Sequence, residues 1–315
     1  MRKLTLLFLC AATVSAVGVS VSHAQETVPA GAGASGRAVL RDFQETCQQL
    51  QTFQAEGEVI SLLDMSGVSA ENVPHLGEEA RRKLREDPDF QSALKTPKKM
   101  RHTFTMALDR SGKYRVDWQQ HMGNGTVVTG AIWSDGKTHY LKLPGRESPI
   151  RQDNRMIALA MATGVSGGAA GTLPPVFYDT RNNPFVAVGN AQSVGSGEIE
   201  GEVCDCVTAT LGHQKMTYWI SRKRKVLLKQ KHELSGDVAP PPIDDEQVKR
   251  ALTAMNREPT PEAVARMKRR MAVARLMTRA MTGSLMQRYY NVRINEPLPS
   301  GLFDAPEETA EAETP

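Results

Sequence analysis

The sequence predicts an α+β fold in which a curved antiparallel sheet forms an unclosed β-barrel and helices cap its concave face. Apolar and polar residues alternate through three consecutive segments, and the breaks between or just after these segments carry Asn-Gly or Asp-Gly pairs. Apolar residues at helical spacing occur in other segments, which supplies the helices and an added helical insert toward the C-terminus. These three observations define the fold class.

The alternating block spans residues 104–133, and its period of two gives each strand one buried face. The apolar positions, with one threonine, are Phe104, Met106, Leu108, Tyr114, Val116, Trp118, Val127, Thr129, Ala131 and Trp133. Gly123-Asn124-Gly125 and Asp135-Gly136 supply the positive φ angles that tight hairpins need. The block is therefore an antiparallel meander. Similar signals predict further strands at 53–64, 191–199, 203–211, 215–221, 225–234 and 288–295.

Helices are predicted where apolar residues recur every three or four positions. The first, 37–52, carries Leu40, Phe43, Cys47 and Leu50 on one face. The others are a compact helix at 156–163 and two helices at 244–256 and 260–286, the last rich in methionine. One dominant sheet suits a single domain over 37–303, with inserts at 66–99, which holds a short charged helix at 77–86, and at 240–286.

The two ends of the chain differ from this domain. Arg2 and Lys3 precede an apolar run that ends in Ser22-His23-Ala24, which predicts a signal peptide over 1–24, cleaved after Ala24, and a periplasmic protein. Residues 25–36 are predicted to be a disordered lead-in, and 304–315 an acidic disordered tail. No later stretch is apolar for long enough to span a bilayer, so we expect a protein that is not membrane-spanning. The 39 basic and 35 acidic residues nearly balance, which argues against nucleic acid as a partner.

Three cysteines follow the predicted cleavage site: Cys47, Cys204 and Cys206. In an oxidising periplasm two of them are expected to pair. A bond from the helix at Cys47 to the strand is reasonable, and we favour Cys206 over Cys204 as its partner. The alternative is a metal site of Cys204, Cys206 and His213, but a single C-x-C has little specificity, and we predict no metal and no cofactor.

Part of the chain resembles the bacterial lipoprotein carriers of the LolA and LolB type. The resemblance covers the N-terminal amphipathic helix, the strand ending at Asp109-Arg110 before Tyr114, the turn Ser134-Asp135-Gly136-Lys137-Thr138, and the closing strand Tyr290-Asn291-Val292-Arg293-Ile294-Asn295. It implies an open barrel that holds acyl chains between its concave face and a helical lid. It also implies that Arg110 ties this lid to the sheet, where Leu40 and Phe43 face it.

Two motifs resemble sites of catalytic proteins, but the secondary structure predicted around them does not match. Gly31-Ala32-Gly33-Ala34-Ser35-Gly36 matches a dinucleotide fingerprint but follows no strand. Gly164-Val165-Ser166-Gly167-Gly168 matches a nucleophile elbow but follows a helix, and a triad with Asp179 and His213 or His232 is the weakest hypothesis. We therefore predict a protein that is not an enzyme.

The remaining hypothesis is a carrier or binding protein for lipid or lipoprotein acyl chains. Its cavity would be lined by Phe104, Met106, Tyr114, Val116, Trp118 and Trp133. An ordinary packed core explains the same alternation equally well. A module of the same fold that binds an envelope protein or senses stress is the alternative function.

Overall fold

The structure, a computed structural model, describes residues 33–64, 78–86, 91, 97–122, 125–178, 185, 190–211, 214–234, 243–254, 258–268, 271 and 282–305. The predicted signal peptide and its cleavage site lie outside these residues, as do most of the lead-in and the tail from residue 306. The lead-in prediction is wrong at its end, because residues 33–36 already belong to the first described helix.

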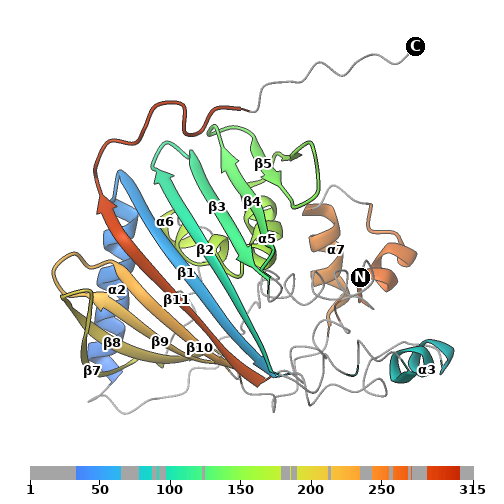
Figure 1. Cartoon of the computed structure of the whole chain (residues 1–315), viewed down its shortest axis with the longest axis horizontal. Helices are drawn as coiled ribbons and strands as arrows, with labels where there is room; N and C mark the ends of the chain where they lie inside the picture. Colours follow the sequence, from blue (N-terminus) through green and yellow to red (C-terminus); the bar gives the residue numbers. More distant parts are fainter. Residues whose placement is uncertain are drawn as a thin grey trace.

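The centre of the molecule is an eleven-stranded sheet in which every neighbouring pair is antiparallel (Figure 1). The strand order is β6-β5-β4-β3-β2-β1-β11-β10-β9-β8-β7, so β6 and β7 are free edges and the sheet does not close. The predicted fold class is confirmed. The strands are β1 Thr52–Asp64, β2 Lys98–Asp109, β3 Tyr114–His121, β4 Val127–Ser134, β5 His139–Lys142, β6 Ile150–Gln152, β7 Gln192–Ile199, β8 Glu202–Leu211, β9 Gln214–Ser221, β10 Leu227–Leu234 and β11 Thr282–Ile294.

The turn between β4 and β5 illustrates how local chemistry sets the register. The Asp135 carboxylate accepts hydrogen bonds from the backbone N–H groups of Lys137 and Thr138, each at 2.8 Å. These bonds hold the pKa of Asp135 below its usual value. Gly136 adopts φ 100°, which a side chain would strain, so the Asp-Gly pair predicted to form a hairpin does so.

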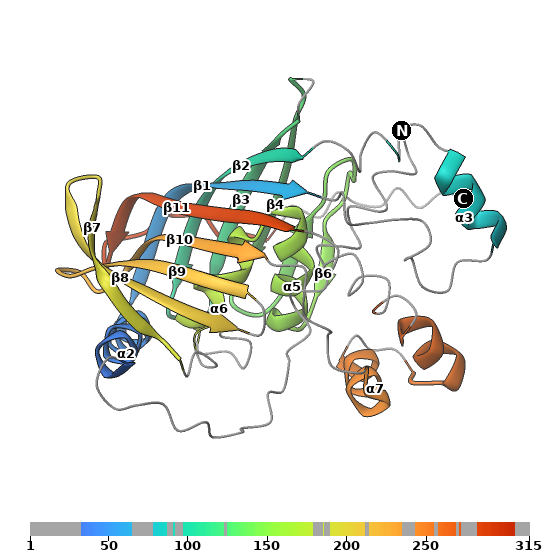
Figure 2. The ribbon, with the colours of Figure 1, turned by 90° about the horizontal axis from the view of Figure 1, so that it is seen from below.

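Three helices cover the concave face of the sheet (Figure 2). They are α2 Gly33–Gln49, α5 Arg155–Val165 and α6 Leu173–Phe177, with a short 3₁₀ turn, η2 Ala169–Gly171, between the last two. Asn154 caps α5 by accepting from the N–H groups of Met156 and Ile157. Helices α3 Glu78–Glu86 and α7 Asp245–Ala254 lie outside this layer. None of the described helices has the length and apolar character needed to cross a membrane.

The C-terminal insert is smaller than predicted. Residues 261–268 are helical, and Val264 packs with Val248 and Leu252 of α7 in a separate small cluster. The prediction of a helix through 286 is wrong at its end, because β11 begins at Thr282 and runs antiparallel to β1 and β10. A glycine at 283 and pairing partners on both sides favour strand there. Residues 272–281 lie outside the described part. The other insert ends two residues earlier than predicted, since β2 begins at Lys98.

Candidate functional site

The strand register decides which side chains share a face. Phe104 lies opposite Trp118, Met106 opposite Val116, and Leu108 opposite Tyr114. Directly opposed residues point to the same side of an antiparallel sheet. The structure therefore brings five of the six predicted cavity residues together on the concave face, under the helices.

Trp133 is the exception, and its prediction is wrong. It pairs with Arg115 and Tyr140, which face the convex side, whereas Ile132 pairs with Val116 on the concave side. The Trp133 ring stacks on Tyr140 at 5.3 Å, and its Nε1 donates to the Asp304 carbonyl at 3.0 Å. Strand β4 is apolar on both faces, so alternation alone does not fix its phase.

The concave face is packed in this closed state. Phe104, Met106, Tyr114, Val116 and Trp118 are each exposed by 4% or less and share one cluster with the helices. Two glycines accommodate the largest rings: a Cβ on Gly57 would lie 2.2 Å from the Phe104 ring, and one on Gly130 would lie 2.3 Å from the Trp118 ring. Access to this face therefore requires the helical layer to move.

Arg110, in the turn after β2, holds two of the covering helices. Its guanidinium donates to the Cys47 carbonyl at 2.6 Å and, through Nε, to the Leu50 carbonyl at 2.9 Å. It also donates to the Phe177 carbonyl at the end of α6 and lies over the Phe177 ring at 4.0 Å. These carbonyls lack partners within their own helices, and a cation there also complements the helix dipole. We call these contacts the Arg110 latch.

The two other predicted lid contacts lie on the core side of α2. Leu40 and Phe43 are buried, and Phe43 meets Phe185 edge-on at 5.0 Å. Phe185 in turn contacts Tyr218 of β9 at 4.8 Å. Helix α2 is thus joined to the sheet through Phe43, Phe185 and Tyr218 and, at its C-terminus, by the Arg110 latch.

Tyr178, just after α6, makes a second tie that sequence reasoning missed. Its hydroxyl donates to the Lys113 carbonyl at 2.6 Å in the β2–β3 turn. Arg155 of α5 lies over the ring at 4.2 Å. Burial is the main cause of the raised pKa of Tyr178, so the hydroxyl stays protonated and serves as a donor. The same short turn therefore holds α6 through two residues.

The three described cysteines are free, so the predicted pairing of Cys47 with Cys206 is not formed. Cys206 lies opposite Trp219, whereas its neighbour Val207 lies opposite Tyr218 in the core. Adjacent strand residues face opposite sides, which places Cys206 on the convex side, away from Cys47. Burial raises the pKa of Cys47 to about 12. Within the described residues no three histidine, cysteine or acidic side chains gather to hold a metal.

The serine of the elbow-like motif has a structural role. Ser166 is fully buried at the end of α5, where its hydroxyl donates to the Thr163 carbonyl at 3.2 Å and accepts from the N–H of Ala170 at 3.2 Å. Asp179 and His213 of the proposed triad lie outside the described residues. The described contacts of Ser166 close a helix end and leave its hydroxyl no access to a substrate.

Sequence reasoning also missed a row of buried polar side chains on the concave face. Gln287 of β11 pairs with Gln230 of β10 on one side and with Val59 of β1 on the other, and Val59 pairs with His102 of β2. Thr172, from the helical layer, donates to Gln287 Oε1 at 3.1 Å. We call His102, Thr172, Gln230 and Gln287 the polar row. No local pattern marks these residues, because the strand register decides that Gln230 and Gln287 face inward.

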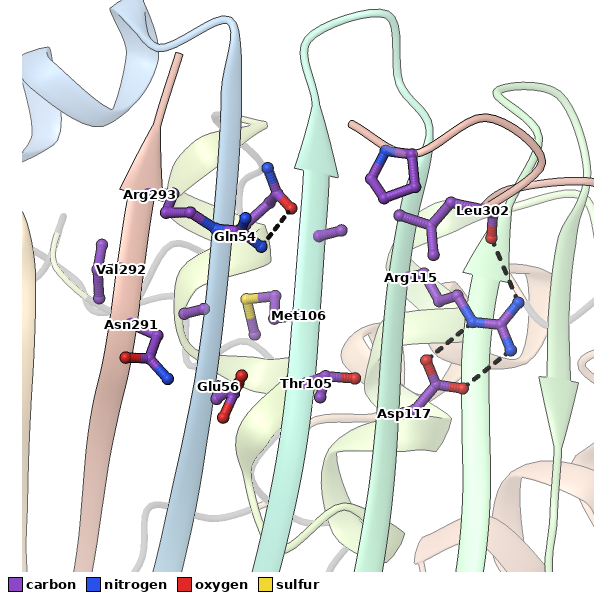
Figure 3. Close-up of a pocket in the computed structure, with 13 residues that line it drawn as sticks. Gln54, Glu56, Thr105, Met106, Arg115, Asp117, Asn291, Val292, Arg293 and Leu302 are labelled. Atoms are coloured by element: carbon purple, nitrogen blue, oxygen red, sulfur yellow. Dashed lines mark hydrogen bonds and ion pairs between the residues drawn. The ribbon is translucent and has the colours of Figure 1, made fainter. Parts of the chain in front are cut away.

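The convex face carries a groove of about 610 Å³ between the sheet and the C-terminal segment (Figure 3). Its walls combine apolar surface with polar pairs: Arg115 pairs with Asp117 at 2.8 Å, and Arg293 donates to Gln54 at 3.0 Å. Leu302 forms part of the roof, and its carbonyl accepts from Arg115. The groove lies on the side of the sheet opposite the predicted ligand face.

The fold and site together define an open antiparallel sheet whose concave face is covered by helices. Two of these helices, α2 and α6, are held at their C-terminal ends by Arg110 in the turn after β2. No protein-family model and no curated protein match the chain. It is similar in structure to the lipoprotein LppX of Mycobacterium tuberculosis (TM-score 0.38, 11% identity, 84% of this chain and 97% of that one). It is also similar to LprF of Mycobacterium bovis (0.38, 11%, 85% and 97%) and to a putative outer membrane lipoprotein-sorting protein domain of Vibrio parahaemolyticus (0.29, 8%, 86% and 97%).

Because all three TM-scores are 0.38 or lower, the fold assignment rests on the strand order and the helical cover of this chain. The matches assign it no ligand.

Proposed function

We propose that this protein is a non-catalytic periplasmic carrier or binding protein for a hydrophobic ligand, such as a lipid or the acyl chains of a lipoprotein. The observation that carries the proposal is the Arg110 latch: one side chain holds the ends of two helices over an aromatic face. Release of Arg110 frees the ends of α2 and α6, and the layer then opens against its remaining contacts, such as the Thr172 hydrogen bond to Gln287. An acyl chain would then replace the helices as cover for the exposed apolar surface.

The acyl chain has to offset the contacts that opening breaks. Each methylene removed from water contributes about 0.8 kcal/mol, so a long acyl chain supplies several kcal/mol without any covalent step. Opening breaks the three hydrogen bonds of the Arg110 latch, each contributing about 1.5–3 kcal/mol, and exposes apolar surface that the ligand then covers. Because the concave face is filled in the closed state, the latch contacts have to break before ligand binds.

Binding of an uncharged apolar probe tests the proposal. Delipidated protein is titrated with diphenylhexatriene, and native mass spectrometry counts the lipids carried by protein purified from the periplasm. Wild type should bind the probe with a defined stoichiometry. Arg110→Leu should bind about tenfold more tightly, because the binding-competent open form becomes more populated. Circular dichroism establishes that the variant is folded.

Arg222→Leu is the matched control, since Arg222 is an exposed arginine whose ion pair is with Asp205 of β8 and not with a carbonyl of the helical layer. It should leave probe affinity unchanged. The carrier proposal would be contradicted if wild-type protein carried no lipid and bound no probe. Capture of a specific envelope protein by such a lipid-free chain would support the interaction or sensing module instead.

A further inference from the structure

The concave face has two chemically distinct parts that adjoin one another. Residues on one face of a strand recur every second position, so His102 lies directly beside Phe104 along β2. Phe104 begins the aromatic part with Trp118, whereas His102 begins the polar row that continues across β1 to Gln287 and Gln230. A ligand lying on this face would meet both parts.

Three members of the polar row are hydrogen-bonded to one another, and the row leaves donors unused. Gln230 Nε2 donates to Thr172 Oγ1 at 2.8 Å and to Gln287 Oε1 at 2.7 Å. Gln287 is 0% exposed, and its Nε2 has no hydrogen-bond partner in the described part of the chain. Nδ1 of His102, which is 3% exposed, also lacks a partner there, and it is a donor in the tautomer that carries the proton on Nδ1. Buried polar atoms are almost always satisfied, and leaving one unsatisfied is costly.

The cover over this row is thin. Gly167 and Gly168 adopt φ values of 66° and 106°, and a Cβ on Gly167 would lie 2.6 Å from His102 Nδ1. Backbone without a side chain therefore lies against the imidazole. This glycine pair links α5 to η2 within the layer that the Arg110 latch holds, so opening that layer uncovers the unused donors.

The row offers neutral hydrogen bonds and no charge. Its members are two amides, one hydroxyl and an imidazole, and burial lowers the pKa of His102 to about 4, which keeps it neutral. Val59 and Tyr218 complete the same row, and the neighbouring row contains Leu285, His232 and Met216. A carboxylate or phosphate placed here would lose its hydration without gaining a counter-charge, whereas a carbonyl oxygen needs only N–H donors.

We infer that the ligand of the concave face is an uncharged acyl ester or amide, whose carbonyl accepts hydrogen bonds from Gln287 and His102 while its chain lies on the aromatic part. This rests on the proposed carrier function and specifies its ligand class. Free fatty acids, which are anions at neutral pH, are the class that the row disfavours.

A comparison of ligands with one chain and different heads tests the inference. Wild-type protein at pH 8 is titrated with monoolein and with oleate, each in competition with diphenylhexatriene. Monoolein should bind at least tenfold more tightly than oleate. Gln287→Leu should reduce that preference by about tenfold. The convex-side variant Gln119→Leu should keep the full preference.

The outcomes separate the two proposals. If diphenylhexatriene does not bind at all, the carrier function itself fails. If it binds but wild type takes oleate as well as monoolein, the unused donors hold only buried water and the inference on ligand class is overturned. An unchanged preference in folded Gln287→Leu also overturns it. The wild-type comparison requires no variant, so a poorly folded variant does not leave the inference untested.

Discussion

The two faces of the sheet carry apolar residues of similar kind but are covered in different ways. On the concave face, Trp118 is buried by a layer of helices and belongs to the main core. On the convex face, Trp133 is covered by Tyr140 and by an irregular C-terminal segment, which also forms one wall of the groove. The comparison teaches that burial alone does not identify a ligand face. The kind of cover, and what fastens it, distinguishes the two.

The largest expected effect comes from the two tryptophans. Trp118→Ala should lower the free energy of unfolding by about 3–5 kcal/mol, because it leaves a large cavity in the main core. Trp133→Ala should cost less, about 1–3 kcal/mol, since its irregular cover can collapse onto the gap. Urea denaturation of both variants measures the difference. Equal losses would mean that the C-terminal segment packs as firmly as the helices do.

How far the sequence predicts this comparison depends on the chemistry of each strand. In β2 and β3 one phase is apolar and the other is polar, so the alternation indicates which residues from Phe104 to Trp118 share a face. In β4, Ile132 and Trp133 are both buried on opposite faces, and the phase depended on tertiary cover that no local pattern records. The start of β11 was missed for a similar reason, since Leu285 and Met286 fit helical spacing as well as strand.

The part of the candidate site that depends on a single residue, Arg110, could be predicted from the sequence. The resemblance pointed to Arg110 at the lid, and the structure gives Arg110 three carbonyl partners in the helical layer. The polar row was missed because Gln230 and Gln287 lie 57 residues apart in sequence and meet only across two strands. Each looks like a surface residue in its own strand, and only the register reveals that both face inward.

The second prediction concerns the pH dependence of stability, to which the buried His102 of the concave face contributes. In the unfolded chain this histidine has an ordinary pKa of 6.5, and burial lowers it to about 4 in the fold. The unfolded state therefore binds more protons between these values, so the stability present above pH 6.5 is lost as the pH falls toward 4. The difference corresponds to about 3 kcal/mol.

Denaturation at pH 7.5, 6, 5 and 4.5 tests this, with His102→Gln for comparison. The variant should lose less stability than wild type over the same range, because it removes one group that must stay neutral in the fold. Other buried histidines, including His139 with a pKa of about 4, keep some pH dependence in both proteins. The same slope in variant and wild type would show that folding leaves the pKa of His102 unchanged.

The smallest expected effect concerns the cysteine thiols, which lie on both faces of the sheet. Cys47 lies in the concave core and Cys206 on the convex side, so alkylation under denaturing, non-reducing conditions should label Cys47, Cys204 and Cys206 in the mature protein. In the native protein Cys206 should react faster than Cys47, because burial raises the pKa of Cys47 to about 12 while Lys229 and Arg222 partly offset the effect of burial at Cys206. Cys206→Ser should change the free energy of unfolding by less than about 1 kcal/mol. A single label on Cys204 in the wild type, with labels on both Cys47 and Cys204 in Cys206→Ser, would instead mean that Cys47 and Cys206 meet, and β8 would then have to present its opposite face to the helices.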